Sequence, residues 1–250
     1  MKATFVQAAA IIAGMLAGGA AVAATQYTLD AGAADATVTS WSAASNSTAL
    51  TKGSLTWYTG GLGAAYAGES TSSPQHALDN DGRYESFLLD FGSEKLRLES
   101  VTVGWPTSGS YDTDFFVLAY TGSLPPVLGS LTYANMKPEN GWEVISVFSN
   151  PGDGTVSLDT SKNIYSSFWL IGAGGFTAGT GVTIDQTCTS FKYDGSCKSW
   201  KKSYDYLKVA GVGGTKSGGG GGGGSVPEPG SLALAGVAFL GLLGLRRKAG

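Results

Sequence analysis

The chain has 250 residues, with 16 Lys or Arg against 19 Asp or Glu, and its formal net charge at pH 7 is −3. This mildly acidic balance argues against nucleic acid as the main partner, because phosphate recognition needs a basic surface. One histidine and two cysteines are also too few ligands for a catalytic zinc site.

The N-terminus, residues 1–24, has the layout of a secretory signal peptide. Lys2 supplies the positive start, residues 5–24 carry no charge, and the small residues AAVAA close the segment at positions 20–24. This layout predicts export, with cleavage after Ala23 or Ala24. A buried N-terminal helix is the alternative, but a helix without a polar face would need burial on all sides.

Residues 25–212 read as one secreted β domain. Short runs rich in β-branched and aromatic residues are separated by Gly, Pro, Asn and Asp, and no window shows a long helical period. The pattern predicts an all-β fold, an antiparallel β-sandwich or jelly roll. Pro138 limits any helix at 134–139 to about one turn. Expected strands are 27–29, 37–41, 54–58, 86–91, 96–105, 114–120, 142–148, 155–158, 167–171 and 204–209.

Two of these segments alternate clearly between apolar and polar residues, and a third does not. SFLLDF places Phe87, Leu89 and Phe91 on one face, and ESVTVGW does the same with its two valines and Trp105. These two are expected to be half-buried strands. FFVLAY, at 115–120, is apolar on both faces, which favours a position inside a sheet.

Cys188 and Cys197 are the two cysteines of the chain. In an exported protein, an even count at short spacing predicts a disulfide. Half of a metal site is the alternative, but the C-x8-C spacing has no nearby histidine to complete it.

An acidic turn, DNDGRYE, concentrates oxygen ligands at residues 79–85. Asp79, Asp81 and Glu85 are therefore candidate Ca²⁺ ligands, because Ca²⁺ prefers six to eight oxygens on a bent backbone. Asp112 and Asp114 flank a second turn and are candidates to add ligands. The alternative is an Asx-type turn before a strand, without a metal. No other cofactor is expected.

Residues 191–208 combine aromatic rings with lysines. Rings stack on sugars and lysines attract anionic polysaccharide. In the alternative interpretation, half of the rings belong to a core strand, and the lysines form a solvated edge that prevents aggregation. The candidate glycan-binding residues are Trp200, Tyr204, Tyr206, Lys201 and Lys202.

Catalytic patterns are weak throughout the chain, and we expect no enzyme. His76 is the single histidine, so a Ser–His–Asp arrangement would have to use it, with Asp79 or Asp81 as the orienting carboxylate. No G-x-S-x-G motif accompanies it. The sequence also singles out no carboxylate pair for glycoside hydrolysis.

The C-terminus begins with a Gly-rich linker, 213–225, that is expected to act as a flexible tether. Residues 232–245 then form an uncharged segment that is short for the hydrocarbon core of a membrane. A basic end follows, at Arg246, Arg247 and Lys248. The pattern predicts a short transmembrane helix with its basic end in the cytoplasm.

This tail, residues 226–250, resembles the PEP-CTERM sorting signal. The resemblance rests on Val226, Pro227, Glu228 and Pro229, then a short hydrophobic helix, then Arg246 and Arg247. It implies recognition by exosortase, a membrane-embedded enzyme, and removal of the tail near the Pro-Glu-Pro motif. The precursor would be anchored in the inner membrane by its C-terminus, and the product delivered to the cell surface or extracellular matrix.

The body is similar, over residues 75–120, to other exosortase-dependent surface proteins and more faintly to galactose-binding-like β-sandwiches. The residues that carry this likeness are HALDNDGRYESFLLDFG followed by LESVTVGW. The leading hypothesis is a surface or matrix protein associated with exopolysaccharide or biofilm. The alternatives are a carbohydrate-binding module, with or without dependence on Ca²⁺, and a small secreted hydrolase.

Overall fold

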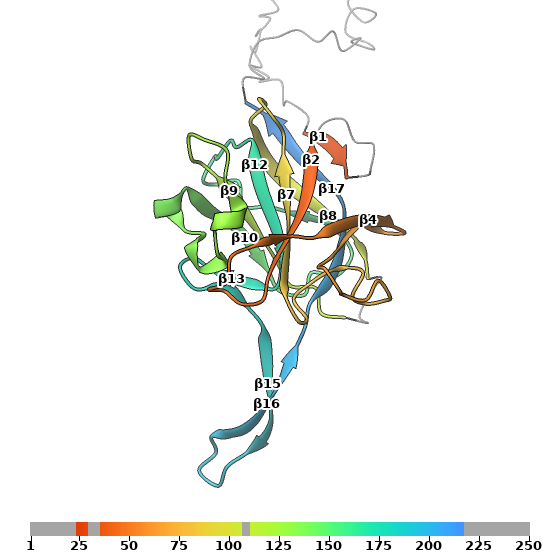
Figure 1. The fold of residues 1–250 in the computed structure, drawn as a ribbon, viewed down its shortest axis with the longest axis vertical. Helices are drawn as coiled ribbons and strands as arrows, with labels where there is room; N and C mark the ends of the chain where they lie inside the picture. Colours follow the sequence, from red (N-terminus) through yellow and green to blue (C-terminus); the bar gives the residue numbers. More distant parts are fainter. Residues whose placement is uncertain (1–23, 30–35, 107–110, 218–250) are drawn as a thin grey trace, which may run out of the picture.

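The computed structural model describes residues 24–29, 36–106 and 111–217. These residues form two antiparallel sheets that face each other, which confirms the predicted all-β fold (Figure 1). All ten expected strands are present, and their ends differ by at most two residues, except that the last, expected to end at 209, continues to Lys216.

The first sheet is built around its longest strand, β17. This strand pairs with β1, β5, β6 and β8. Two outer strands complete the sheet, β4 beside β5 and β11 beside β8. Because β1 pairs with the end of β17, Thr25 opposite Gly214, the two ends of the described body lie together. Its strands are β1 (Thr25–Thr28), β4 (Ser54–Tyr58), β5 (Gly61–Ala65), β6 (Leu78–Asp79), β8 (Leu96–Trp105), β11 (Gly154–Ser157) and β17 (Tyr206–Lys216).

The second sheet has the strand order β10-β9-β12-β7-β2-β3. The FFVLAY segment is β9, and it lies between β10 and β12, as its two apolar faces predict. The strands are β2 (Thr37–Ala43), β3 (Thr51–Lys52), β7 (Tyr84–Asp90), β9 (Phe115–Tyr120), β10 (Trp142–Phe148) and β12 (Phe168–Ala173).

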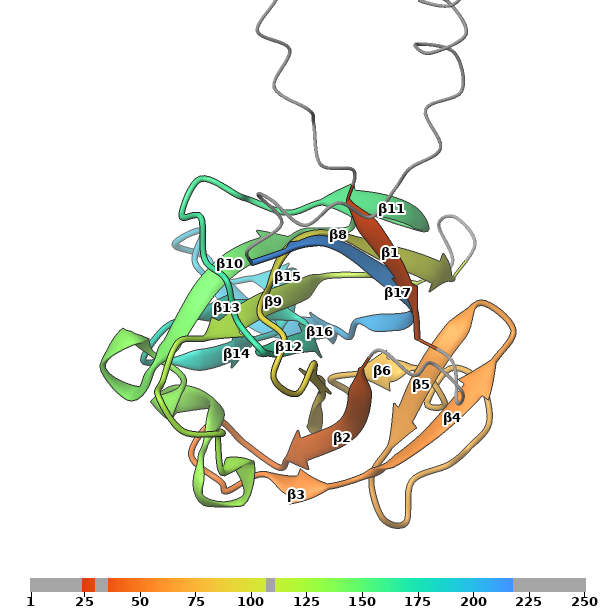
Figure 2. The same ribbon diagram turned by 90° about the horizontal axis from the view of Figure 1, so that it is seen from above.

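The main core lies between the two sheets (Figure 2). Val101 and Val103 of β8 enter it from the first sheet, while Phe87 and Leu89 of β7 enter it from the second. The alternation placed all four on the inner faces, but Trp105, which it placed there too, is half-buried outside this core and packs against the Lys208 ammonium. Burial of this apolar surface is the main force that holds the sheets together.

A second core covers the outer face of the second sheet. Leu88 and Phe116 point into it, and the hydroxyl of Tyr133 donates a hydrogen bond to Ser86 Oγ at 2.9 Å. β7 is therefore buried on both faces rather than half-buried, because a segment after β9 folds back over it. That segment has only 3-10 turns, at η1 (Leu128–Ser130), η2 (Tyr133–Asn135) and η3 (Pro138–Asn140), in line with the limit set by Pro138.

The strands that the sequence pattern did not predict are short or polar. Besides β3, β5 and β6, the structure adds two hairpins, β13 (Gly175–Thr177) with β14 (Gly181–Thr183), and β15 (Asp185–Phe191) with β16 (Cys197–Ser203). β15 and β16 lack an apolar face, so periodicity does not reveal them.

The expected domain boundary at 212 is four residues too early, because β17 continues to Lys216. Gly213 and Gly214 pair with β8 instead of starting the linker. A Cβ on Gly214 would lie 2.5 Å from the Arg97 carbonyl oxygen, so glycine here permits close packing. The expected signal peptide apart from Ala24, residues 218–225 of the expected linker, and the tail 226–250 lie outside the described residues. Within the described ranges, no helix is long and apolar enough to span a membrane.

Candidate functional site

The β15–β16 hairpin projects from the sandwich as an isolated arm (Figure 1). The two strands pair with each other, with Thr187 opposite Lys201 and Cys188 opposite Trp200, and no other described strand pairs with them. The arm leaves the end of the sandwich opposite to the end of β17 (Figure 1). It is therefore the part of the described body farthest from where the C-terminal linker begins.

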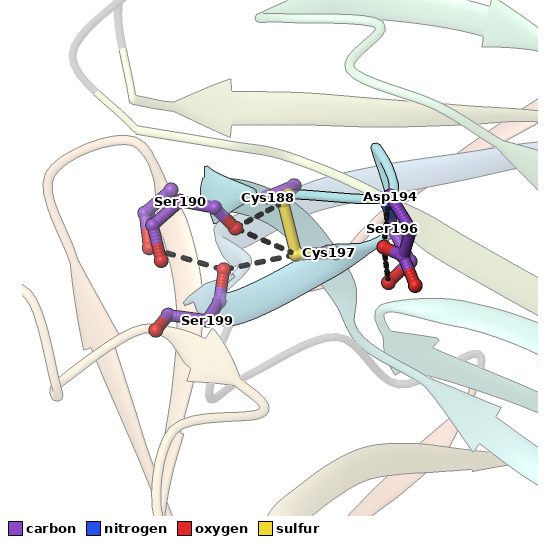
Figure 3. Close-up of a disulfide and its surroundings, with 7 residues drawn as sticks. Cys188, Ser190, Asp194, Ser196, Cys197 and Ser199 are labelled. Carbon is purple, nitrogen blue, oxygen red and sulfur yellow. Dashed lines mark hydrogen bonds between the residues drawn. A yellow bond between two sulfur atoms is a disulfide. The ribbon is translucent and has the colours of Figure 1, made fainter. Parts of the chain in front are cut away.

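The predicted disulfide is confirmed and lies across this arm (Figure 3). It joins Cys188 of β15 to Cys197 of β16, with a Cα–Cα distance of 5.8 Å. The two sulfur atoms approach the carbonyl oxygens of Ser190 and Ser199 at 3.1 and 3.0 Å. The covalent bond closes an arm that no other described strand supports by pairing.

The tip of the arm is a tight turn closed by hydrogen bonds. The Lys192 N–H donates to the Ser196 carbonyl at 2.7 Å, and Gly195 has a φ of 82°, a conformation that glycine adopts readily. The Asp194 carboxylate accepts hydrogen bonds from both the N–H and the hydroxyl of Ser196, at 2.9 and 2.7 Å. Turn and disulfide together give the arm a defined shape.

Exposed aromatic rings are concentrated on the arm. Phe191 is 68% exposed, Tyr193 109% and Trp200 60%; in the described ranges the only other exposed aromatic side chain is Trp57, on β4. The arm also carries four exposed lysines against two aspartates, in a chain whose net charge is negative. The lysines are Lys192, Lys198, Lys201 and Lys202.

The predicted glycan-binding residues do not all lie together. Trp200, Lys201 and Lys202 are exposed on the arm, and Tyr204 is half-buried beyond its base. Tyr206 is buried at the start of β17, where its hydroxyl donates to Asp81 Oδ2 at 2.9 Å. The structure thus separates an exposed group on the arm from a buried tyrosine in the sandwich.

The acidic turn has a different arrangement from the predicted one. Asp79 and Glu85 are fully buried, and the Asp79 N–H donates to Glu85 Oε2 at 3.3 Å. Asp79 Oδ1 accepts the Asp81 N–H at 2.9 Å, which is the Asx turn considered as the alternative. Glu69, from the loop between β5 and β6, lies close enough for its charge to raise the pKa of both Asp79 and Glu85. Glu69 lies ten residues before Asp79 in the chain, outside the DNDGRYE turn, so the sequence pattern did not include it.

Burial strongly perturbs these carboxyl groups. It raises the pKa of Asp79 to about 9, with a further contribution from the Glu69 charge. Burial and the neighbouring Asp79 and Glu69 also raise the pKa of Glu85 well above its usual range. Both effects disfavour the ionised form, as expected for carboxylates removed from water and placed beside each other.

A second acidic group contains Asp112, Asp114 and Asp205, each of which offers one oxygen within 4.8 Å of the others. Burial, followed by the charge of Asp114, raises the pKa of Asp205 to about 7. Hydrogen bonds already occupy these carboxylates: Asp114 accepts the Asn150 N–H at 2.6 Å, and Asp205 accepts the Asp114 N–H at 3.0 Å.

His76 lies beside a buried lysine in an aromatic cluster. Its ring is 4.6 Å from that of Tyr58 and 5.7 Å from that of Trp105, centroid to centroid. The Lys208 ammonium lies 4.9 and 4.7 Å from the same two rings, a cation–π arrangement. Burial and then Lys208 lower the pKa of His76. The ring Nδ1 of His76 is buried without a hydrogen-bond partner among the described residues.

Comparison with known proteins bears on the tail. A family model described as a PEP-CTERM protein-sorting motif matches residues 225–248. No curated protein and no solved structure matches the chain significantly, so the likeness to galactose-binding-like sandwiches is not confirmed. The match includes Val226, Pro227, Glu228 and Pro229 together with Arg246 and Arg247. The chain therefore carries a C-terminal PEP-CTERM motif, which directs exosortase-dependent sorting of surface proteins.

Proposed function

We propose that this protein is a non-enzymatic component of the cell surface or extracellular matrix that binds anionic polysaccharide through its β15–β16 arm. The observation that carries the proposal is the exposure of Phe191, Tyr193 and Trp200 beside four lysines on a disulfide-closed hairpin. The sorting motif supports the proposal, because sorting to the cell surface would bring the arm within reach of a surface polysaccharide.

The chemistry of the arm suits this ligand. Aromatic faces accept weak C–H contacts from sugar rings, and lysines attract carboxylate, sulfate or phosphate groups on a polymer. Exposing three large rings to water is otherwise unfavourable for a soluble domain. A function only as a solvated edge would explain the lysines but would leave the exposure of the rings without a reason.

The position of the arm supports the same proposal. It projects from the end of the sandwich opposite to the end of β17, after which the linker and the sorting motif follow (Figure 1). A precursor held in the membrane by its tail would therefore present the arm outward. The disulfide reduces the number of conformations that the arm has to lose when it binds.

Affinity electrophoresis in gels containing alginate, an anionic polymer, or dextran, a neutral one, tests the proposal. We expect the exported protein to be retarded by alginate and much less by dextran, with a retardation that weakens as salt is added. Trp200→Ala should lower the affinity about tenfold, which corresponds to losing one stacked ring worth about 1.4 kcal/mol. Replacing both Lys201 and Lys202 with alanine should reduce the salt dependence.

Trp57→Ala is the matched control, because Trp57 is also an exposed tryptophan, 41% accessible, but lies on β4 rather than on the arm. It should bind alginate like the unmodified protein. Equal losses in the two tryptophan variants, or no loss in either, would contradict binding through the arm. Turnover of a polysaccharide that is abolished by His76→Ala would instead favour the hydrolase hypothesis.

A further inference from the structure

The loop that follows β9, residues 121–127, carries the two most exposed large aliphatic side chains of the described body. Leu124 is 75% exposed and Val127 is 70% exposed. Pro125 and Pro126 stand between them, and their rings restrict the backbone. Single apolar residues scattered over a surface are common, but a pair on one short loop points to a contact. We call residues 121–127 the apolar loop.

Both ends of the apolar loop are held by the sandwich. The Thr121 N–H donates to the Gly141 carbonyl at 2.7 Å, and Leu128, directly after the loop, is buried in the second core. Leu124 and Val127 therefore remain in water on a segment whose neighbouring leucine is fully packed. The fold presents these two side chains rather than leaving them on a loose end.

The apolar loop lies at the end of the body from which the C-terminal linker leaves. Leu124 and Lys95 line the same cavity, which has a volume of about 210 Å³. The carbonyl of Lys95 accepts the Ser217 N–H at 2.7 Å, and Ser217 is the last described residue. The loop is thus beside the start of the linker, and this end of the body is opposite to the β15–β16 arm (Figure 1).

The chain after Ser217 leads to the sorting motif. Residues 218–231 separate Ser217 from the uncharged segment 232–245, and a chain of that length reaches at most about 50 Å when fully extended. The motif implies a precursor that is anchored in the membrane through its C-terminus. In that precursor, the end of the body that carries the apolar loop is held within reach of the lipid surface.

The surroundings of the apolar loop suit a membrane interface. Tyr120 and Tyr165 are half-buried and line the same cavity, and tyrosine is enriched where one part of the ring is in an apolar region and the other in water. Lys95 is exposed and belongs to none of the ion pairs of the described residues, so its ammonium group can attract anionic headgroups. The neighbouring Glu94 is paired with Lys216 at 2.7 Å.

We propose that the apolar loop contacts the membrane in the anchored precursor, and that the side chains of Leu124 and Val127 enter the interfacial region of the bilayer. Apolar side chains that leave water stabilise such a contact, and a nearby cation adds attraction to anionic lipids. The contact orients the body with its arm directed away from the lipid. The proposal rests on the anchoring that the sorting motif implies and not on polysaccharide binding, so failure of the arm to bind alginate would leave it intact.

Quenching of a fluorophore by lipid-attached nitroxides tests the proposal. The full-length precursor with Leu124→Cys, labelled with NBD, is reconstituted into vesicles of phosphatidylethanolamine and phosphatidylglycerol. The Cys188–Cys197 disulfide leaves the introduced thiol as the site of labelling. Nitroxides on the acyl chains should reduce NBD emission about twofold, because a side chain in the interface lies at the headgroup and acyl boundary. Lys198→Cys with the same label is the matched control, since Lys198 is exposed on the arm, and its emission should not change.

A second labelled variant distinguishes insertion from proximity to the vesicle. With NBD at Val127→Cys, the additional substitution Leu124→Asp should abolish quenching, because a carboxylate is costly to remove from water. Both side chains are largely exposed, so the melting temperature should stay the same and show that the fold is intact.

The proposal is overturned by an unquenched label at position 124, by equal quenching at positions 124 and 198, or by quenching at position 127 that survives Leu124→Asp. It is also overturned by an emission change at position 124 that needs no lipid and grows with protein concentration, which would identify a second copy of the chain as the partner of the loop.

Discussion

Asn80 and Asp205, 125 residues apart in the chain, hold each other through two hydrogen bonds. The Asn80 side-chain amide donates to Asp205 Oδ2 at 2.6 Å, and the Asp205 N–H donates to Asn80 Oδ1 at 2.9 Å. Both residues are about 1% exposed. The pair connects the acidic turn after β6 to the residue before β17 and so to the second acidic group, of which Asp205 is a member.

Asn80→Ala should therefore destabilise the fold. The substitution leaves the Asp205 carboxylate and backbone N–H with fewer partners in a buried site, at a cost of about 2–5 kcal/mol. Urea denaturation followed by tryptophan fluorescence measures the change in the free energy of unfolding. Asn140→Ala is the control, because it removes only an exposed hydrogen bond to the Asn135 carbonyl. Equal effects of the two substitutions would mean that burial of the Asn80–Asp205 pair adds nothing to the free energy of unfolding.

Loss of the disulfide should affect the β15–β16 arm more than the sandwich. Cys188 and Cys197 are nine residues apart, and the bond closes a loop within the arm alone. On a chain-entropy model, that closure contributes about 2–3 kcal/mol to the order of the arm. In Cys188→Ser/Cys197→Ser, trypsin should cleave faster after Lys192, Lys198 and Lys201, while the melting temperature of the sandwich changes little.

Mass spectrometry of the tryptic fragments distinguishes the two regions, and Lys52, on the short strand β3, provides a reference cleavage site in the sandwich. Cleavage that accelerates equally at Lys52 would show that the disulfide supports the whole domain. Fragments of the unmodified protein should remain linked through Cys188 and Cys197 until a reductant is added.

The sorting motif makes a prediction about location. Replacing Pro227, Glu228 and Pro229 with alanine removes two rigid backbone positions and one carboxylate from the motif, while the N-terminus of the chain is unchanged. Export should continue, but the uncleaved protein should remain in the inner membrane. Immunoblots of membrane and surface fractions measure the change in size and location.

Alanine at Pro125, Pro126 and Glu139 is the composition-matched control, because these residues lie in the described body and outside the motif. That variant should be processed and delivered normally. Delivery of the motif variant to the surface at normal size would show that the Pro-Glu-Pro residues are not needed for sorting.

Much of the sandwich was predictable because period-2 alternation reports which residues leave water. Phe87 and Leu89 on β7 and Val101 and Val103 on β8 were placed correctly from that pattern alone. The pattern did not show that Leu88 is also buried, because the covering segment around Tyr133 comes from a distant part of the chain. A short strand such as β6 offers too few residues for any period to be recognised.

Some features of the candidate sites could likewise be predicted from the sequence, and others depended on the tertiary structure. The Cys188–Cys197 bond and the sorting motif are local, so spacing and residue order in the sequence by itself determined them. The sequence pattern already grouped Glu85 with Asp79, but only the tertiary structure brings Glu69 close to them and directs the Asp81 carboxylate to the Tyr206 hydroxyl. The physical reason is that burial and charge repulsion depend on which groups share a volume of space, and a linear pattern does not contain that information.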